Sequence, residues 1–180
     1  MSDSDYLPPS EREAELWARL ESATGSDRAD VLLELSGLRN LVDDLVSAMS
    51  LADEALQVAQ DLESESLIAL AHAGRGVVLY NRGDYLEAAK AHNQAIEIVR
   101  NTSDLPQLYH SLVCATDAYS QAEAPELALE MAEAGVECAT ELEDDARLLL
   151  ALVRKADLLE ELGRDDEILE VVSQARQAAR

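Results

Sequence analysis

The sequence repeats itself every 40 residues, and this period limits the possible folds more than any other feature. One register holds the small or apolar residues Ala48, Ala88, Ala128 and Ile168, and a second register, seven residues later, holds Ala55, Ala95, Gly135 and Ala175. Seven residues make two helical turns, so each pair of positions marks one face of a helix. This period predicts an all-α solenoid of antiparallel helix pairs, each burying its apolar face against its neighbours.

A third register predicts where the two helices of each pair cross. It holds the small residues Ser36, Gly76, Thr116 and Ala156. Two helices approach closely only where at least one side chain is short. We therefore expect these four positions to lie at the contact between the helices of a pair.

The composition supports a chain made only of helices. Ala and Leu dominate, there is no Phe and only one Trp, and seven Gly and four Pro leave room for long helices. We expect a tail over residues 1–9, a capping helix over 10–25 that starts at Ser10 and ends near Gly25, and four helix pairs over 26–180 in a single domain. Cys114 and Cys138, without metal-ligand spacing, are expected to be reduced thiols.

The tripeptide Arg82-Gly83-Asp84 has the sequence of a cell-adhesion ligand, but its position indicates a turn. Gly83 precedes Gly163 by 40 residues, and both fall between expected helices. Glycine adopts the left-handed conformation that ends one helix, and aspartate caps the start of the next. We therefore interpret Gly83 as the stop and Asp84 as the cap of the following helix.

The run from Gly76 to Ala95 resembles the tetratricopeptide repeat (TPR) family. The residues that carry the resemblance are Gly76, Tyr80, Gly83, Asp84, Tyr85, Ala88 and Ala95. It extends over four units from about Ala29 to Arg180, with Asp43 and Glu123 in place of the turn glycine. The period exceeds the family's usual length of about 34 residues, so the units resemble its longer-helix variants. The resemblance implies a right-handed superhelical solenoid of four helix pairs plus an N-terminal helix.

The resemblance also implies a ligand site on the concave groove formed by the first helix of each pair. Carried over by register, the groove comprises Leu33, Gly37, Asn40, Ala73, Val77, Tyr80, Asn81, Val113, Asp117, Gln121, Val153, Arg154 and Asp157. Arg154 is the only cation among these positions, which argues against the carboxylate clamp of the family's cochaperone branch. Tyr80 is the expected main anchor for a partner.

A formal net charge of −23 restricts the partners. Phosphate backbones and anionic membranes would be repelled, so we expect no nucleic-acid and no membrane binding. The charge is uneven: residues 29–68 carry −8 and residues 109–148 carry −9, whereas residues 69–108 are neutral. A partner segment is therefore expected to be basic or neutral, with apolar anchors. The first residues do not have the pattern of a secretory signal, and we expect a cytoplasmic protein.

The sequence contains no catalytic motif, and we expect no enzyme activity and no cofactor. His72 and His92 occupy inward helix positions and are interpreted as core histidines rather than metal ligands. The leading hypothesis is a non-enzymatic adaptor that holds a peptide or helix of another protein. The alternatives are a module that forms a homodimer through its last helix, at Ile168, Val171 and Val172, or the interaction domain of a larger regulator.

Overall fold

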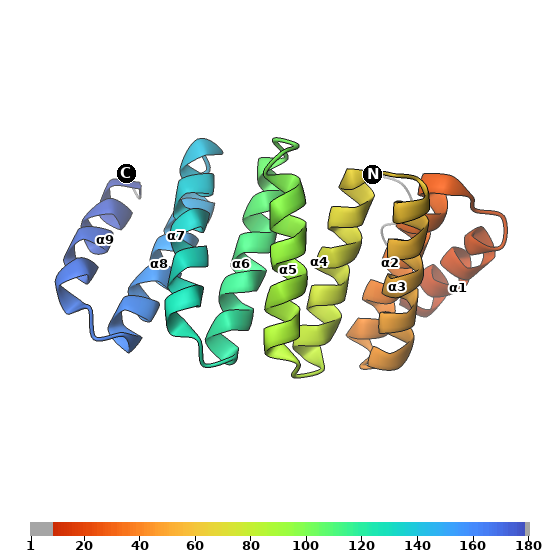
Figure 1. Cartoon of the computed structure of the whole chain (residues 1–180), viewed down its shortest axis with the longest axis horizontal. Helices are drawn as coiled ribbons and strands as arrows, with labels where there is room; N and C mark the ends of the chain where they lie inside the picture. The colour runs from red at the N-terminus through yellow and green to blue at the C-terminus, as the bar shows by residue number, and fades with distance from the viewer. Residues whose placement is uncertain (1–8, 179–180) are drawn as a thin grey trace. The chain divides into compact units, whose positions relative to one another are not determined.

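The computed structural model describes residues 9–178, and these residues form nine α-helices (Figure 1). In chain order the helices are α1 (Pro9–Leu20), α2 (Gly25–Leu41), α3 (Leu45–Asp61), α4 (Glu65–Asn81), α5 (Tyr85–Val99), α6 (Leu105–Gln121), α7 (Pro125–Glu141), α8 (Asp145–Glu161) and α9 (Asp165–Ala178). The four predicted repeats correspond to α2–α3, α4–α5, α6–α7 and α8–α9, and α1 precedes them. The prediction of an all-helical chain with one helix before four repeats is confirmed.

The helices belong to two compact units, residues 1–83 and residues 84–180. In the first unit α1 packs against α2, α2 against α3, and α3 against α4, and α2 also reaches α4. In the second unit each of α5, α6, α7 and α8 packs against the next helix in the chain. Figure 1 shows the hairpins α2–α3, α6–α7 and α8–α9 as antiparallel neighbours.

The turns recur at half the period found in the sequence. Residues with a left-handed backbone occur every 20 residues, with φ between +51° and +84°, at Asp43, Glu63, Gly83, Ser103, Glu123, Glu143 and Gly163. The helix that follows often starts with an aspartate cap, because Asp44, Asp104 and Asp144 each accept a hydrogen bond from a backbone N–H three residues later. Each 40-residue repeat therefore consists of two similar helix-turn halves.

The Arg82-Gly83-Asp84 segment is one of these turns, as predicted. Gly83 has φ +84°, and its N–H donates to the carbonyl oxygen of Tyr80 at 3.0 Å. Asp84 occupies the N-cap position of α5. The tripeptide thus has a structural use at the junction of two helices.

The predicted crossing register is confirmed by direct contact in the first pair. Ser36 is 2% exposed, and its hydroxyl donates to the carbonyl oxygen of Ala48 on α3 at 2.8 Å. Gly76 and Thr116 are also buried, whereas Ala156 in the last pair is half-buried. Packing at this register is therefore looser at the end of the chain.

Each unit has its own core of mostly aliphatic side chains. In the first unit the core joins α1, α2 and α3, through Leu16, Leu20, Val31, Leu32, Leu35, Leu51 and Ala55. In the second unit it joins α5 to α8, through Ile96, Tyr109, Leu112, Ala115, Cys138, Ala139 and Ala151. Cys114 is half-buried, Cys138 is buried, and both thiols are free, as expected.

The N-terminal boundaries differ from the sequence prediction. Helix α1 starts at Pro9, so Ser10 lies inside the helix instead of capping it, and α1 ends at Leu20. Gly25 does not end α1; it opens α2 with φ +57°. The N–H groups of Ser22 and Ala23 instead close α1 by donating to the carbonyl oxygen of Arg19. Residues 1–8 of the expected tail lie outside the described residues.

None of the helices of residues 9–178 is both long and apolar enough to cross a bilayer.

Candidate functional site

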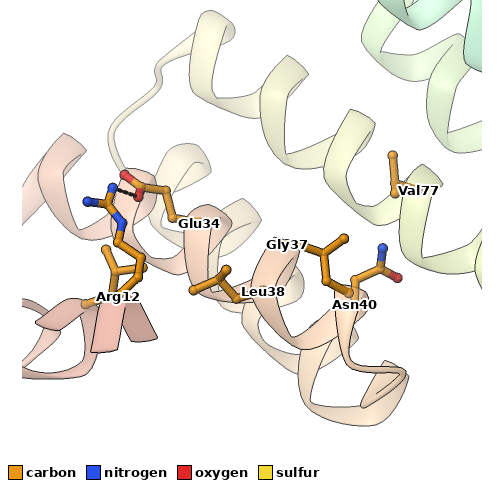
Figure 2. A pocket seen from close by; sticks show the side chains of 8 residues that line it. Arg12, Glu34, Gly37, Leu38, Asn40 and Val77 are labelled. Carbon is orange, nitrogen blue, oxygen red and sulfur yellow. Dashed lines mark hydrogen bonds and ion pairs between the residues drawn. The ribbon is translucent and has the colours of Figure 1, made fainter. Parts of the chain in front are cut away.

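The first unit contains an apolar pocket between α1, α2 and α4. It has a volume of about 390 Å³ and is lined by Arg12, Leu16, Glu34, Gly37, Leu38, Asn40, Leu41 and Val77. Figure 2 shows Arg12 and Glu34 at one end of this pocket and Asn40 and Val77 at the other. We call it the first-unit pocket.

Apolar side chains form most of the first-unit pocket. Leu16 is buried and belongs to the core of the first unit, whereas Leu41 stands at the rim with 79% of its surface exposed. The guanidinium of Arg12 donates to a carboxylate oxygen of Glu34 at 2.6 Å, so both charges at this end are paired. An apolar side chain of a partner would bury Leu41 without separating this ion pair.

A second cavity of about 220 Å³ adjoins the first-unit pocket and shares Gly37, Asn40 and Val77 with it. Gly37 is exposed, and a Cβ atom placed there would have no heavy atom within 4 Å. Asn40 accepts a hydrogen bond from the side-chain amide of Asn81 at 3.0 Å. The amide pair therefore joins α2 to α4 beside the cavities and offers further donors and acceptors to a ligand.

The second unit has a polar pocket at the matching register, between α6 and α8. It measures about 170 Å³ and is lined by Thr116, Asp117, Ser120, Arg154, Asp157, Leu158 and Glu161. Arg154 donates two hydrogen bonds to the carboxylate of Asp117, at 3.1 and 3.3 Å. This carboxylate raises the pKa of Arg154. The one cation predicted for the groove is thus already paired within the chain.

Within each unit, some of the predicted groove residues line a common cavity and others do not. Leu33, Gly37, Asn40 and Val77 line the two cavities of the first unit, and Asp117, Arg154 and Asp157 line the polar pocket of the second. Asn81 is exposed and bonded to Asn40, Tyr80 is half-buried, and Gln121 and Val153 are exposed on their helices.

Two predicted groove positions lie against the core. Ala73 is only 7% exposed, and the half-buried Val113 packs against the core of the second unit. The register places a residue on a helix face, but neighbouring helices cover part of that face.

Sequence reasoning missed Arg12, Leu16, Leu38 and Leu41 of the first-unit pocket. Arg12 and Leu16 lie on α1, which precedes the repeats and has no register. The sequence did contain a signal for Leu41, because the equivalent positions 40, 80 and 120 residues later hold Asn81, Gln121 and Glu161. An apolar residue at a position that is otherwise polar is a sign of a binding surface.

The two inward histidines lie in interior environments. His92 on α5 is 1% exposed, and burial lowers its pKa to about 4. His72 on α4 is half-buried, and burial lowers its pKa as well. Among residues 9–178 no group of three or more His, Cys, Asp or Glu side chains is arranged to hold a metal ion.

The predicted self-association residues differ in their exposure. Val171 is 4% exposed and packs inside its own chain, so this position does not offer an external contact. Ile168 is half-buried and Val172 is 39% exposed. The most exposed apolar side chain of α9 is Leu169, at 76%. The external apolar surface of α9 is therefore Leu169 with Val172.

Solved structures with this arrangement of helices are numerous. The repeats of a Podosopora anserina putative kinesin light chain, described as nearly identical TPR-like repeats, superpose with a TM-score of 0.76 at 16% identity, over 95% of this chain and 87% of that one. The fold is that of the tetratricopeptide repeat proteins. No family model matches the sequence, and no curated protein matches it.

Two further TPR-like matches differ in how much of the solved chain they cover. BtubC (BKLC) from P. vanneervenii gives a TM-score of 0.84 at 13% identity, over 95% of this chain and 73% of that one. A Rap protein in complex with the competence and sporulation factor gives 0.75 at 12% identity, over 94% of this chain. The present chain spans about half of that Rap protein, 48% of its length. At these identities the likeness concerns the fold alone.

Proposed function

We propose that this TPR-like chain is a cytoplasmic, non-enzymatic scaffold that binds a peptide or helix of a partner protein along its inner helices. The observation that carries the proposal is the first-unit pocket, where Leu16, Leu38, Leu41 and Val77 leave an apolar cavity open beside the Asn40–Asn81 amide pair. An apolar cavity with a few polar groups at its edge is the usual form of a recognition site. The Rap protein, which shares the fold, was solved with a bound factor, and this supports a binding role.

The charge of the chain specifies the chemistry of the partner. Acidic residues exceed basic ones by 23, and Arg12 in the first-unit pocket is already paired with Glu34. An acidic segment would be repelled, whereas a segment with one or two Lys or Arg beside a Leu, Ile or Phe anchor would be attracted. Binding is expected to weaken as salt is added, mainly because association becomes slower.

Gly37→Leu tests this proposal because it fills the cavity without straining the chain. Gly37 is helical and exposed, and a side chain there meets no other atom, so leucine should be tolerated or mildly stabilising. Random 12-residue peptides displayed on phage would be selected against the 180-residue chain. We expect enrichment of basic peptides with an aliphatic or aromatic anchor, and loss of their binding to Gly37→Leu.

Ser50→Leu is the matched control, since Ser50 is exposed on α3, outside both cavities. It adds the same side chain and should leave peptide binding unchanged. The proposal fails if no peptide is enriched, or if the enriched peptides bind Gly37→Leu as well as the unaltered chain. Tyr80→Ala adds a second check: if it lowers affinity while the melting temperature is retained, Tyr80 is an anchor as predicted.

Self-association is the second candidate function, and the exposure of Leu169 and Val172 on α9 favours it. Exposed apolar patches often mark contacts between proteins. A module that joins two copies of this chain would bury both side chains.

A further inference from the structure

The last helix exposes apolar positions that are buried in the preceding pair. Leu169 and Val172 correspond, 40 residues earlier, to Leu129 and Ala132 on α7, and both of these are 3% exposed. In α9 the same two positions are 76% and 39% exposed. Helix α8 packs against α7 directly after it in the chain. A face that is buried in one repeat therefore lies open in the next.

The exposed face of α9 is a stripe with a charge at each end. Asp165, Leu169, Val172 and Arg176 are all exposed and are spaced by four, three and four residues. At about 100° per residue, this spacing keeps all four within about 60° of one another around the helix. The stripe has an acidic side chain at the N-terminal end, two apolar side chains in the middle and a basic side chain at the C-terminal end. We call it the α9 stripe.

The order of residues along the α9 stripe is complementary to itself when reversed. We infer that α9 pairs with α9 of a second copy of this chain, antiparallel and about a two-fold axis midway between Leu169 and Val172. In this arrangement Leu169 packs against Val172 of the second copy, and Asp165 faces Arg176 of the second copy. Symmetry repeats each contact, so the pairing forms two apolar contacts and two ion pairs.

Charge complementarity favours a second copy over another occupant of the stripe. The chain carries −23 and repels itself at most surfaces, so close approach of two copies requires local pairing of opposite charges. The antiparallel arrangement supplies it twice, because each Asp165 meets an Arg176. A parallel arrangement would place Asp165 beside Asp165 and Arg176 beside Arg176, with repulsion at both ends. This inference rests on the self-association proposed above and assigns its residues and its symmetry.

Sedimentation equilibrium of the 180-residue chain tests the pairing first. A single helix seam is small compared with a stable interface, so concentrations should extend to about 300 μM. We expect a monomer–dimer equilibrium, and at least about tenfold weaker association for Leu169→Glu, which places a carboxylate in the apolar centre. Leu150→Glu is the control. Leu150 on α8 is 48% exposed, and its counterpart 80 residues earlier, Leu70, is also exposed, at 39%, so exposure at this position is not peculiar to the last repeat. Association of Leu150→Glu should equal that of the unaltered chain.

Charge reversal then tests the direction of the helices. Asp165→Arg alone and Arg176→Asp alone each place like charges opposite one another, and each should weaken self-association. An equimolar mixture of the two variants should form a heterodimer. In it, the new Arg of Asp165→Arg faces the new Asp of Arg176→Asp, and the unaltered Arg176 of the first variant faces the unaltered Asp165 of the second. The double variant Asp165→Arg/Arg176→Asp should dimerise alone, as well as the unaltered chain does. A parallel pairing predicts instead that the single variants leave association unchanged, because each position would then face a like charge before and after the substitution.

Each outcome decides between pairing and its alternatives. A monomer at every concentration, or an unchanged dimer in Leu169→Glu, overturns the inference. A dimer whose double variant is not restored overturns the antiparallel direction. Melting curves of every variant establish that the helices are folded. Because Gly37→Leu affects only the first-unit pocket, it should leave the dimer unchanged, so failure of pairing and failure of peptide binding are distinguishable.

Discussion

The pockets of the two units lie at the same register of the repeat, but their chemistry differs. In the first unit the cavity at this register is lined by Gly37, Gly74 and Val77, measures about 220 Å³ and adjoins the first-unit pocket. In the second unit the Asp117–Arg154 pair joins α6 to α8, and the pocket measures about 170 Å³. The repeat therefore determines where a pocket forms, and the residues that depart from the repeat determine what it can bind.

The largest expected difference between the units concerns the crossing register. Ser36 donates to the carbonyl oxygen of Ala48 on the neighbouring helix, whereas Thr116 donates to the carbonyl oxygen of Leu112 on its own helix. Ser36→Leu loses the contact between helices and overpacks it, so the free energy of unfolding should fall by about 3 kcal/mol. Thr116→Val keeps the volume and should cost about 1 kcal/mol or less. Urea unfolding measures both changes.

Ser50→Leu again serves as the control, and its free energy of unfolding should change by no more than about 0.5 kcal/mol. If Ser36→Leu is as stable as this control, then Ser36 does not mark the crossing between α2 and α3.

The second expected difference is in acid sensitivity. The second unit buries His92 where the first unit has Ala52, and burial holds the pKa of His92 at about 4, below its ordinary value of 6.5. Between these two pH values the unfolded chain binds a proton that the folded chain does not. Stability is therefore complete above pH 6.5 and is lost as the pH falls towards 4, by about 3 kcal/mol for this one group.

Free energies of unfolding measured between pH 7 and pH 4 check this expectation in the unaltered chain and in His92→Ala. The variant restores the residue of the first unit and should show a shallower loss in acid, whatever its stability at neutral pH. Equal slopes for the two chains would mean that His92 is accessible to protons in the folded state. His72, which is half-buried and also has a lowered pKa, should contribute a smaller part of the remaining slope.

The third expected difference concerns the ion pair of the polar pocket. Asp117→Leu leaves the guanidinium of Arg154 without its carboxylate, and we expect a loss of about 1 kcal/mol, because both side chains are partly exposed. Adding Arg154→Leu should recover most of this loss and make the second pocket apolar like the first. A double-mutant cycle measures the coupling between the two side chains. A coupling of zero would show that the pair adds nothing to stability.

The sequence predicted the repeat architecture because its period arises from buried contacts. Ala48, Ala88 and Ala128 recur because each is fully buried in a helix, and this pattern reveals both the helices and their pairing. The turns at Glu63, Ser103 and Glu143 were not anticipated, because these residues adopt a left-handed backbone without being glycine. The fold was thus predictable where a structural feature requires one kind of residue, such as a small side chain at a buried helix contact. It was not predictable where several residue types form the same feature, such as the left-handed turns.

The candidate site was less predictable, because it depends on what covers each face. Ala73 and Val171 carry the expected register but are covered by other parts of the chain. Arg12 and Leu16 lie on α1, outside the period, yet they help to form the first-unit pocket. A periodic pattern identifies which residues share a face, whereas burial depends on neighbouring helices that the pattern does not place.

The smallest expected difference between the units lies in their turns. Asp43 in the first unit and Glu123 in the second both adopt a left-handed backbone, with φ +62° and +56°, at positions where the other repeats have Gly83 and Gly163. Glycine adopts this conformation without a steric penalty, so both substitutions to glycine should stabilise the chain. Aspartate tolerates it better than glutamate because its short side chain can bond to the nearby backbone. We therefore expect a gain of about 0.5 kcal/mol for Asp43→Gly and about 1 kcal/mol for Glu123→Gly.

Gly163→Ala, the reverse change, should cost about 1 kcal/mol. Thermal unfolding of the three variants checks both the signs and the order. If Glu123→Gly is destabilising, then the carboxylate of Glu123 makes a contact that outweighs backbone strain, and the two turns are equivalent in shape but not in what stabilises them.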